Sequence, residues 1–156
     1  MLEWQQRPLA YRARLPACPP MPIGVWIIDD TPSHHTAAAH VVAQLSTFAL
    51  ETFDDGASAV AEFTLRAASA PQTLPRIILM DFFMGDMRGD EATRLIRAID
   101  PRGFPPIIVG YSSVASGSAA IVAAGGDVVV RKRIADDGSN PALREYLETF
   151  LRIAGS

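Results

Sequence analysis

Five short hydrophobic stretches lie along this chain, and between them are segments in which apolar residues recur at helical spacing. Residues 23–28 are continuously apolar and 76–80 end in an apolar run, as expected of strands that are buried on both faces of a sheet. Residues 107–111 and 127–131 are predicted to be two further strands. Residues 48–53 are more polar, a pattern typical of an edge strand.

Helices are predicted in the intervals between these strands and after the last one. Proline and glycine mark their limits, with Thr31 as the expected N-cap of the first helix and Gly125-Gly126 as a glycine C-cap of the fourth. Apolar residues lie at three- and four-residue spacing in the last helix. The predicted helices cover 32–45, 57–69, about 89–99, 117–124, and a last segment from Asn140-Pro141 through Phe150.

Five strands alternating with five helices predict an α/β fold with a doubly wound parallel sheet covered by helices on both faces. Right-handed crossovers bring the carboxyl ends of all strands to one edge, where ligands of such sheets bind. We expect one domain over 23–156, preceded by a flexible extension, 1–22, that is rich in proline and arginine. An alternative is that translation begins at Met21.

Composition and charge argue against several classes of protein. A formal net charge of -3 over 156 residues provides no basic surface for nucleic acid. The apolar runs are far shorter than the roughly 20 residues that a membrane span requires. The single cysteine, Cys18, forms no internal disulfide, which fits a reducing compartment. We therefore expect a soluble, cytoplasmic protein.

Charged and hydroxyl side chains follow the predicted strands at the points where they end. Asp29 and Asp30 come after the first strand, Asp81 after the third, Ser112 after the fourth and Lys132 after the fifth. Converging carboxylates repel each other, and a hard divalent cation such as Mg²⁺ relieves that repulsion. A carboxylate at such a site can attack a phosphoryl group and form an aspartyl phosphate. The lysine ammonium and the serine hydroxyl are then suited to hold phosphoryl oxygens.

These residues resemble the receiver domains of two-component response regulators over about 23–153. Asp29-Asp30 is similar to the acidic pair of that family, and Asp81 is similar to its phosphoacceptor. Residues 84–89 resemble the methionine- and glycine-containing loop that follows the phosphoacceptor. Residues 124–132 resemble the family's alanine-glycine, strand and lysine signature.

The resemblance implies a flavodoxin-like sheet of strand order 2-1-3-4-5. It also implies that a sensor histidine kinase or a histidine phosphotransfer protein donates a phosphoryl group to Asp81, with Lys132 and Ser112 assisting. The implied Mg²⁺ ligands are Asp29, Asp30, Asp81 and the backbone carbonyl of Phe83. Few residues follow the last helix, so we expect output through contact with a downstream protein partner. Formation of a homodimer is left open.

The chain departs from the family pattern at several positions. Gly85 stands where the loop proline is usual, so we expect a less rigid loop. Arg133 replaces the proline that commonly follows the lysine, and Val129 replaces the aromatic residue of the fifth strand. Phe83, two residues after Asp81, is bulky and is expected to crowd the access of water or of a partner.

The hydroxyl residue after the fourth strand has two candidates. The family has a threonine or serine here, and strict counting from Asp81 selects Tyr111 rather than Ser112. We favour Ser112, because a tyrosine cannot place a short hydroxyl beside the phosphoryl group. This choice requires a small gap in the helix that follows.

Two other functions fit parts of the pattern. A phosphorylation-independent, receiver-like interaction module is favoured by the substituted positions, and Asp81→Asn would leave its partner binding unchanged. A Mg²⁺-dependent phosphatase also forms an aspartyl phosphate, but it carries a second aspartate two residues after the nucleophile, where this chain has Phe83. We therefore expect a signalling protein and not an enzyme.

Simpler interpretations apply to some of the polar residues. Asp29 and Asp30, taken alone, are also suited to capping the helix that follows them. His34, His35 and His40 do not share a helix face, so a metal site of histidines is not expected. We expect these histidines to be solvent-facing or to lie at the start of the helix.

Overall fold

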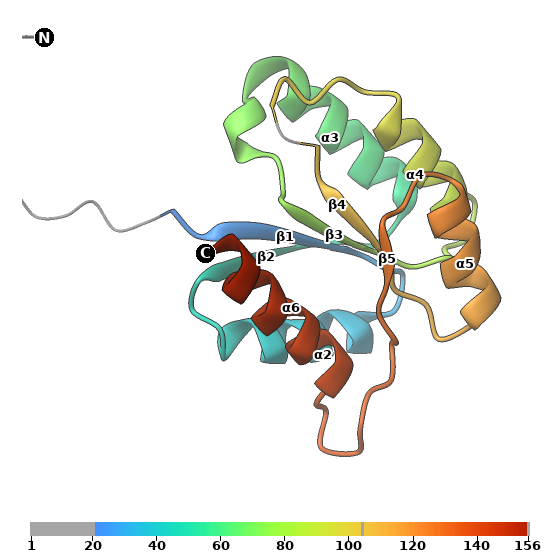
Figure 1. Ribbon diagram of the computed structural model, residues 1–156. Coiled ribbons are helices and arrows are strands. Elements are labelled where there is room, and N and C mark those ends of the chain that lie inside the picture. Colours follow the sequence, from blue (N-terminus) through green and yellow to red (C-terminus); the bar gives the residue numbers. More distant parts are fainter. Residues whose placement is uncertain (1–20, 104, 156) are drawn as a thin grey trace, which may run out of the picture.

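A five-stranded parallel sheet forms the centre of the protein (Figure 1), seen in a computed structural model that describes residues 21–103 and 105–155. The strand order is β2-β1-β3-β4-β5, as predicted. All four strand pairs are parallel, so the carboxyl ends of the strands share one edge. The strands are β1 (Ile23–Ile28), β2 (Phe48–Phe53), β3 (Ile77–Met80), β4 (Ile107–Gly110) and β5 (Val128–Val129).

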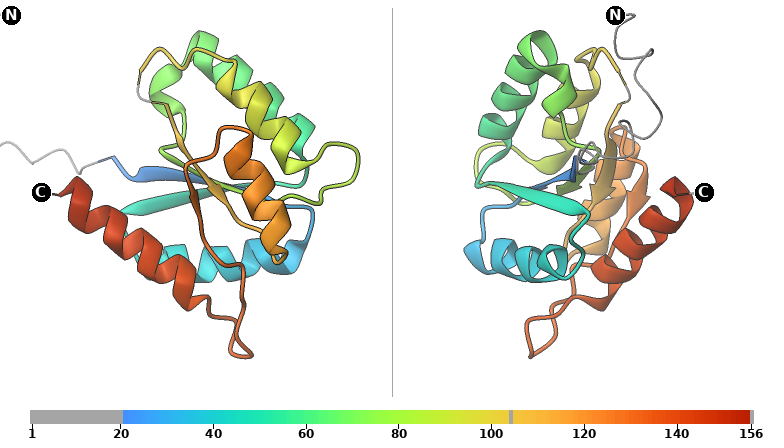
Figure 2. Two further views of the ribbon diagram at one scale, coloured as in Figure 1. Left: turned by 45° about the vertical axis from the view of Figure 1, so that its right-hand side comes forward. Right: turned by 90° about the vertical axis from the view of Figure 1, so that its left-hand side faces the viewer.

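Helices cover both faces of this sheet, and the two turned views in Figure 2 separate the layers. One face carries α2 (Pro32–Ala43) and α6 (Pro141–Ala154). The other carries α3 (Gly56–Ser69), α4 (Gly89–Arg97) and α5 (Ala115–Ala123). A short 3₁₀ helix, η1 (Pro71–Thr73), precedes β3. Within the described ranges, none of these helices combines the length and the apolar character needed to cross a membrane.

Two hydrophobic cores lie on opposite faces of the sheet because successive strand residues point to opposite sides. Val25 and Ile27 of β1 face α2 and α6, whereas Trp26 and Ile28 face the other helices. Strands with both faces buried are continuously apolar, which explains why β1 and β3 were readable from sequence. The predicted extension, 1–22, lies almost entirely outside the described residues.

The fifth strand is shorter than predicted, since only Val128 and Val129 pair with β4 instead of 127–131. Before the strand, the Asp127 carboxylate accepts the backbone N–H of Ile108 at 2.9 Å and an Arg97 guanidinium N–H at 2.7 Å. After the strand, the Val130 N–H still donates to the Gly110 carbonyl at 3.1 Å, and the chain then leaves the sheet. In Figure 1, the segment that follows β5 runs down below α2, turns at the bottom of the view and rises into α6.

The C-cap predicted for α5 and the N-cap predicted for α2 are both found, but the N-cap lacks the usual side-chain hydrogen bond. Gly125 has φ 123°, and the N–H groups of Gly125 and Gly126 donate to Val122 and Ile121 at 3.1 and 3.0 Å, so a glycine C-cap ends α5. Thr31 has the extended conformation of an N-cap, but its side chain makes no capping hydrogen bond to α2. Its hydroxyl donates to Asp30 instead, at 3.3 Å.

The packing of α6 against the sheet is testable with a matched pair of leucines. Leu147 is fully buried, whereas Leu65 of α3 is 60% exposed. We expect Leu147→Ala to lower the free energy of unfolding by about 2–5 kcal/mol through lost burial and a cavity. Leu65→Ala is expected to change it by less than about 0.5 kcal/mol. Urea unfolding measures both, and equal effects would contradict this assignment of the core.

Candidate functional site

Three carboxylates converge at the carboxyl edge of the sheet. Asp29, Asp30 and Asp81 each place one carboxylate oxygen within 4.8 Å of the others. The backbone N–H of Asp29 donates to Phe53 at 3.0 Å, and that of Asp81 donates to Ile28 at 3.0 Å. The sheet hydrogen bonds therefore continue one residue beyond the strands and hold the two buried acids in place. Asp30 is exposed.

Lys132 reaches these acids from the segment after β5. Its ammonium contacts the Asp29 carboxylate and lies 3.0 Å from Asp81 Oδ1. The ammonium also lies 5.6 Å from the centre of the Tyr111 ring, within range of a cation–π interaction. The lysine side chain is almost fully buried, so the charge that it carries is available only to the site.

Burial has the largest effect on the pKa of Asp81, and it raises that pKa above the ordinary value of 3.8. The nearby Asp29 charge also raises the pKa, while Lys132 and the backbone N–H of Phe82 lower it. The balance is upward, so the ionised carboxylate is disfavoured in the folded protein. A group that adds positive charge at the site would relieve this cost.

The backbone behind Asp81 is packed against the start of α4. The N–H of Gly89 donates to the Phe82 carbonyl at 2.9 Å. A Cβ atom at position 89 would lie 1.9 Å from the Asp81 carbonyl oxygen, so only glycine fits there. Asp90, in the first turn of α4, is buried and pairs with Arg88 and Arg94. The start of α4 therefore lies directly against the backbone of Asp81 and Phe82.

Two histidines lie at the start of α2, which was one of the two positions expected for them, and they also contact the site. His34 Nδ1 lies 2.9 Å from Asp29 Oδ2 and 3.1 Å from Lys132 Nζ. His35 Nε2 lies 2.6 Å from the backbone carbonyl oxygen of Asp29. The reason is local: α2 begins only three residues after Asp29, so its first turn folds back over that residue. His40, five residues after His35, is exposed as expected.

The other oxygen of Asp29 accepts the backbone N–H of Thr31 at 2.9 Å. Asp29 therefore interacts with protein donors through both carboxylate oxygens and through its backbone carbonyl. Sequence reasoning missed the histidines because helix-face spacing does not describe contacts with the residues just before a helix. Their position directly after the acidic pair was the available signal.

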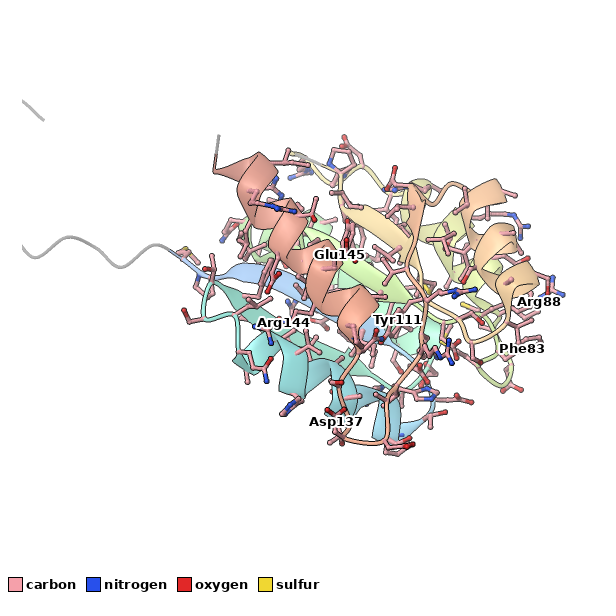
Figure 3. The ribbon with its side chains drawn as sticks, turned by 60° about the horizontal axis from the view of Figure 1, so that its bottom comes forward. Phe83, Arg88, Tyr111, Asp137, Arg144 and Glu145 are labelled. Atoms are coloured by element: carbon pink, nitrogen blue, oxygen red, sulfur yellow. The ribbon has the colours of Figure 1, made fainter. Side chains whose placement is uncertain are left out.

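Tyr111 and Ser112 occupy different environments after β4. Met80 pairs with Gly110, so Tyr111 is the residue that follows in register beside Asp81. Its buried hydroxyl accepts an Asn140 side-chain N–H at 2.6 Å, at the start of α6, and burial raises the pKa of the phenol to about 12. Figure 3 shows Tyr111 near that end of α6. The Tyr111 hydroxyl is therefore occupied by a hydrogen bond within the core.

Ser112 comes one residue later and is buried at the start of the loop to α5. Its Oγ accepts the Val114 backbone N–H at 3.2 Å, and its own N–H donates to Ser118 Oγ at 3.2 Å. The contact of Ser112 with a phosphoryl group stays a prediction.

The loop after Asp81 carries an exposed aromatic residue. Phe83 is 58% exposed and packs edge-to-face on Phe82, with ring centres 4.8 Å apart. The Arg88 guanidinium lies 5.5 Å from the centre of the Phe82 ring, and Figure 3 shows Phe83 and Arg88 at the outer edge of the molecule. Gly85 has φ 58°, which proline cannot adopt. The metal contact of the Phe83 carbonyl stays a prediction.

The donor set suits a hard divalent cation. Three carboxylates face one ammonium, and oxygen is the ligand atom that Mg²⁺ prefers. Asp30, the exposed member of the cluster, lines a cavity of about 540 Å³ whose wall includes the loop residues Met84 and Gly85. The residues therefore fit a Mg²⁺ ion that retains water on its open side.

Comparisons with known proteins agree on the type of domain. The family model described as response regulator receiver domain matches residues 25–144. A comparison with curated protein sequences found no match. Among solved structures, the receiver domain of the histidine kinase CKI1 from Arabidopsis thaliana is similar, with a TM-score of 0.68 and 20% identity, covering 87% of this chain and 92% of that one.

Two further solved structures have the same fold. A CheY-like response regulator receiver domain protein from Methanospirillum hungatei has a TM-score of 0.63 and 16% identity, covering 85% of this chain and 93% of that one. A CheX-CheY-BeF3-Mg complex from Borrelia burgdorferi contains a similar chain, with a TM-score of 0.64 and 16% identity, covering 85% and 90%. At these identities, the structural likeness shows the fold.

Replacing Asp81 by asparagine is expected to stabilise the metal-free protein at neutral pH. The folded protein binds the Asp81 proton more tightly than the unfolded chain, because the folded pKa is raised above 3.8. Stability therefore falls as pH rises through the folded pKa, and it is restored as pH falls below the unfolded value. Thermal unfolding in EDTA should give a higher Tm for Asp81→Asn at neutral pH and a shrinking difference in acid.

Asp137 provides a control of opposite sign. It is exposed, and hydrogen bonds from Ser139 lower its pKa. Asp137→Asn should therefore not stabilise the protein at neutral pH. A Tm difference between wild type and Asp81→Asn that does not change with pH would show that the buried charge of Asp81 is not its cause.

Proposed function

The chain belongs to the response regulator receiver domains of two-component signalling, and we propose that Asp81 accepts a phosphoryl group from a phosphohistidine. The observation that carries this proposal is the position of Asp81, 3.0 Å from the buried Lys132 ammonium and beside two further carboxylates. The charge of a buried carboxylate with a raised pKa is costly, and either a bound metal ion or reaction with a phosphoryl group can compensate it.

The reaction forms one bond and breaks one bond. An Asp81 carboxylate oxygen attacks phosphorus, the P–N bond of the donor phosphohistidine breaks, and the electron pair leaves with the imidazole of the donor. Lys132 offers an ammonium hydrogen to a phosphoryl oxygen, and we assign a second such contact to the Ser112 hydroxyl. Attack needs the ionised carboxylate, but the raised pKa of Asp81 disfavours ionisation. Added positive charge at the site would keep the Asp81 carboxylate ionised.

Mg²⁺ is the cofactor that we propose for this site. Asp29, Asp30, Asp81 and the Phe83 backbone carbonyl are the proposed ligands, with water on the open side. The ion supplies charge neutralisation between the carboxylates and a phosphoryl oxygen. Within this set, exposed Asp30 accepts the Thr31 hydroxyl at 3.3 Å, whereas both carboxylate oxygens of Asp29 have protein hydrogen-bond partners.

The proposed partners follow from this chemistry. A sensor histidine kinase or a histidine phosphotransfer protein supplies the phosphoryl group, and a downstream protein binds the phosphorylated form. A homodimer is a further proposed assembly, and exposed Val129 of β5, 49% accessible, is a candidate contact for either partner. We place the reaction in the cytoplasm, and we assign the protein to signal transfer rather than to catalysis on an external substrate.

A second function is favoured by the loop after Asp81. Phe83 projects from it, and Gly85 adopts a backbone conformation that the usual proline cannot adopt. Both features are also compatible with a receiver-like interaction module whose partner binding does not depend on phosphorylation. In that case, partner binding would be the same for Asp81→Asn as for wild type.

Intact-mass measurement tests the proposal. Incubation with Mg²⁺ and acetyl phosphate is expected to add one phosphoryl group to wild-type protein and none to Asp81→Asn. Omitting Mg²⁺ or adding EDTA should abolish the gain, because the acidic cluster then lacks its neutralising ion. The same two proteins should differ in affinity for any partner that reads phosphorylation.

Two results would contradict the proposal. An equal mass gain in Asp81→Asn would place the phosphoryl group elsewhere. No gain in wild type, together with unchanged partner binding in Asp81→Asn, would establish the interaction module.

Phe83 should control how quickly the site reacts. Its ring packs on Phe82, the residue that follows the acceptor, and we propose that it narrows the approach of donors and of water. We expect Phe83→Ala to raise the rates of phosphorylation by acetyl phosphate and of phosphoryl loss by about tenfold, equivalent to about 1.4 kcal/mol of barrier. Val114→Ala, an exposed apolar residue of the β4–α5 loop, is the control and should leave both rates unchanged. Equal rates in all three proteins would rule out crowding by Phe83.

A further inference from the structure

Lys132 reaches Asp81 by crossing the end of another strand. Strand β4 lies between β5 and β3 in the sheet, so a side chain that starts after β5 must pass the end of β4 to reach Asp81. The residue at that end is Tyr111, whose backbone N–H donates to Met80 at 2.8 Å. The Lys132 ammonium lies over the Tyr111 ring, 5.6 Å from the ring centre. The ring is therefore part of the surface along which the lysine approaches Asp81.

The Tyr111 ring is held at its hydroxyl end by α6. Tyr111 is fully buried, and its hydroxyl accepts the Asn140 side-chain N–H at 2.6 Å. The side-chain oxygen of Asn140 accepts the Leu143 N–H at 3.1 Å as the N-cap of α6, so the amide nitrogen is the atom that faces the tyrosine. This hydrogen bond fixes the orientation of the ring relative to the sheet edge.

An aromatic ring attracts a cation in a different way from a carboxylate. The negative face of the ring attracts an ammonium group through its quadrupole, most strongly where water is excluded. The Lys132 side chain is 2% exposed, so solvent screens this attraction little. A ring face also occupies no ammonium hydrogen in a fixed direction. The ammonium can therefore stay over Tyr111 while its three hydrogens turn to new acceptors.

Other groups attract the ammonium away from β4. Asp29, which follows β1 on the far side of β3, contacts Lys132, and His34 Nδ1 lies 3.1 Å from the ammonium. His34 is 25% exposed and lines a cavity of about 650 Å³. The Tyr111 ring attracts the same ammonium from the β4 side of Asp81. Loss of the ring would leave the attraction toward Asp29 and His34 unopposed from that side.

We propose that Tyr111 is a positioning residue that holds the Lys132 ammonium beside Asp81 through the face of its ring, while Asn140 fixes that ring. The lysine then donates to an oxygen of the phosphoryl group without leaving Tyr111. This role belongs to the ring and not to the hydroxyl, so it differs from the contact assigned to Ser112. The inference rests on the proposed phosphorylation of Asp81.

Two substitutions separate the ring face from the rest of the side chain. Tyr111→Phe and Tyr111→Leu both remove the hydrogen bond to Asn140 and keep the position apolar, but only phenylalanine keeps an aromatic face. Intact mass followed over time, with Mg²⁺ and acetyl phosphate, measures the rate of phosphorylation of the full chain. We expect Tyr111→Leu to lower this rate about tenfold through loss of the cation–π contact. Tyr111→Phe should lower it about twofold, because its ring is no longer fixed by Asn140.

Two further variants serve as controls. Tyr146 packs against the same hydrophobic core from α6, so Tyr146→Leu also removes an aromatic ring from that core and should leave the rate unchanged. Asn140→Ser keeps a side chain that can cap α6 and removes the N–H donated to Tyr111. It should resemble Tyr111→Phe in rate.

NMR of the lysine side chain shows where the ammonium lies when the site is occupied. The samples contain Mg²⁺ and beryllofluoride, an analogue of the phosphoryl group, and fluorine-19 signals show that the analogue is bound. Protons over the face of an aromatic ring resonate upfield. We expect the methylene protons of Lys132 to be shifted upfield in wild type and in Tyr111→Phe, and to lose this shift in Tyr111→Leu.

The outcomes separate this inference from the function on which it rests. Absence of phosphorylation and of a bound fluorine signal in wild type would overturn the proposed function and this inference together. Phosphorylated wild type with equal rates in Tyr111→Phe and Tyr111→Leu would overturn the role of the ring and leave phosphorylation standing. Lys132 protons without an upfield shift in the wild-type complex would overturn it as well. An equal loss of rate in Tyr146→Leu would show that core packing, and not the ring beside Lys132, is the cause.

Discussion

The ion pairs between one buried ammonium and two buried carboxylates hold the functional end of this protein together. Asp29 and Asp81 carry charge at the edge of a sheet that is otherwise apolar, and Lys132 is the cation that reaches both. Isolated charges in such a place are costly, so both carboxylates depend on the ammonium that Lys132 supplies. The raised pKa of Asp81 shows that even this compensation is incomplete. The excess negative charge makes the site receptive to a cation and to phosphoryl chemistry.

The rest of the fold serves to keep these groups in register. Sheet hydrogen bonds continue through the backbone of Asp29 and Asp81, and Gly89 allows α4 to contact the Asp81 carbonyl directly. The first turn of α2 adds His34 and His35 around Asp29. The acceptor is thus rigid on the sheet side, whereas the loop with Phe83 and the cavity beside His34 open to solvent.

Much of this arrangement was predictable because it depends on short stretches of sequence. Buried strands are continuously apolar, and a charged residue follows several of them. Because the carboxyl ends of parallel strands share one edge, the sequence alone places Asp29, Asp81 and Lys132 together. Other features depend on distances between elements, which a sequence pattern does not contain. The choice between Tyr111 and Ser112 depends on the register of β3 and β4, and that register puts Tyr111 beside Asp81 while its hydroxyl belongs to the core. His34 and His35 were expected to face solvent or to lie at the helix start, but their contacts with Asp29 were not expected, because a helix turn contacts the residues before it as well as its own face.

Lys132 also affects how the two-residue strand β5 is held at the edge of the sheet. Backbone N–H groups of Asp127 and Val130 donate to β4 at Ile108 and Gly110, and the Asp127 carboxylate also accepts from Ile108 and Arg97. Two residues after Val130, the Lys132 side chain contacts Asp29 and Asp81. Side chains on both sides of β5 therefore add to the backbone hydrogen bonds that hold this edge of the sheet. A group on Asp81 that attracts Lys132 would therefore also change the contacts that hold the chain directly after β5. Chemistry at the acidic cluster is in this way linked to the position of the edge strand.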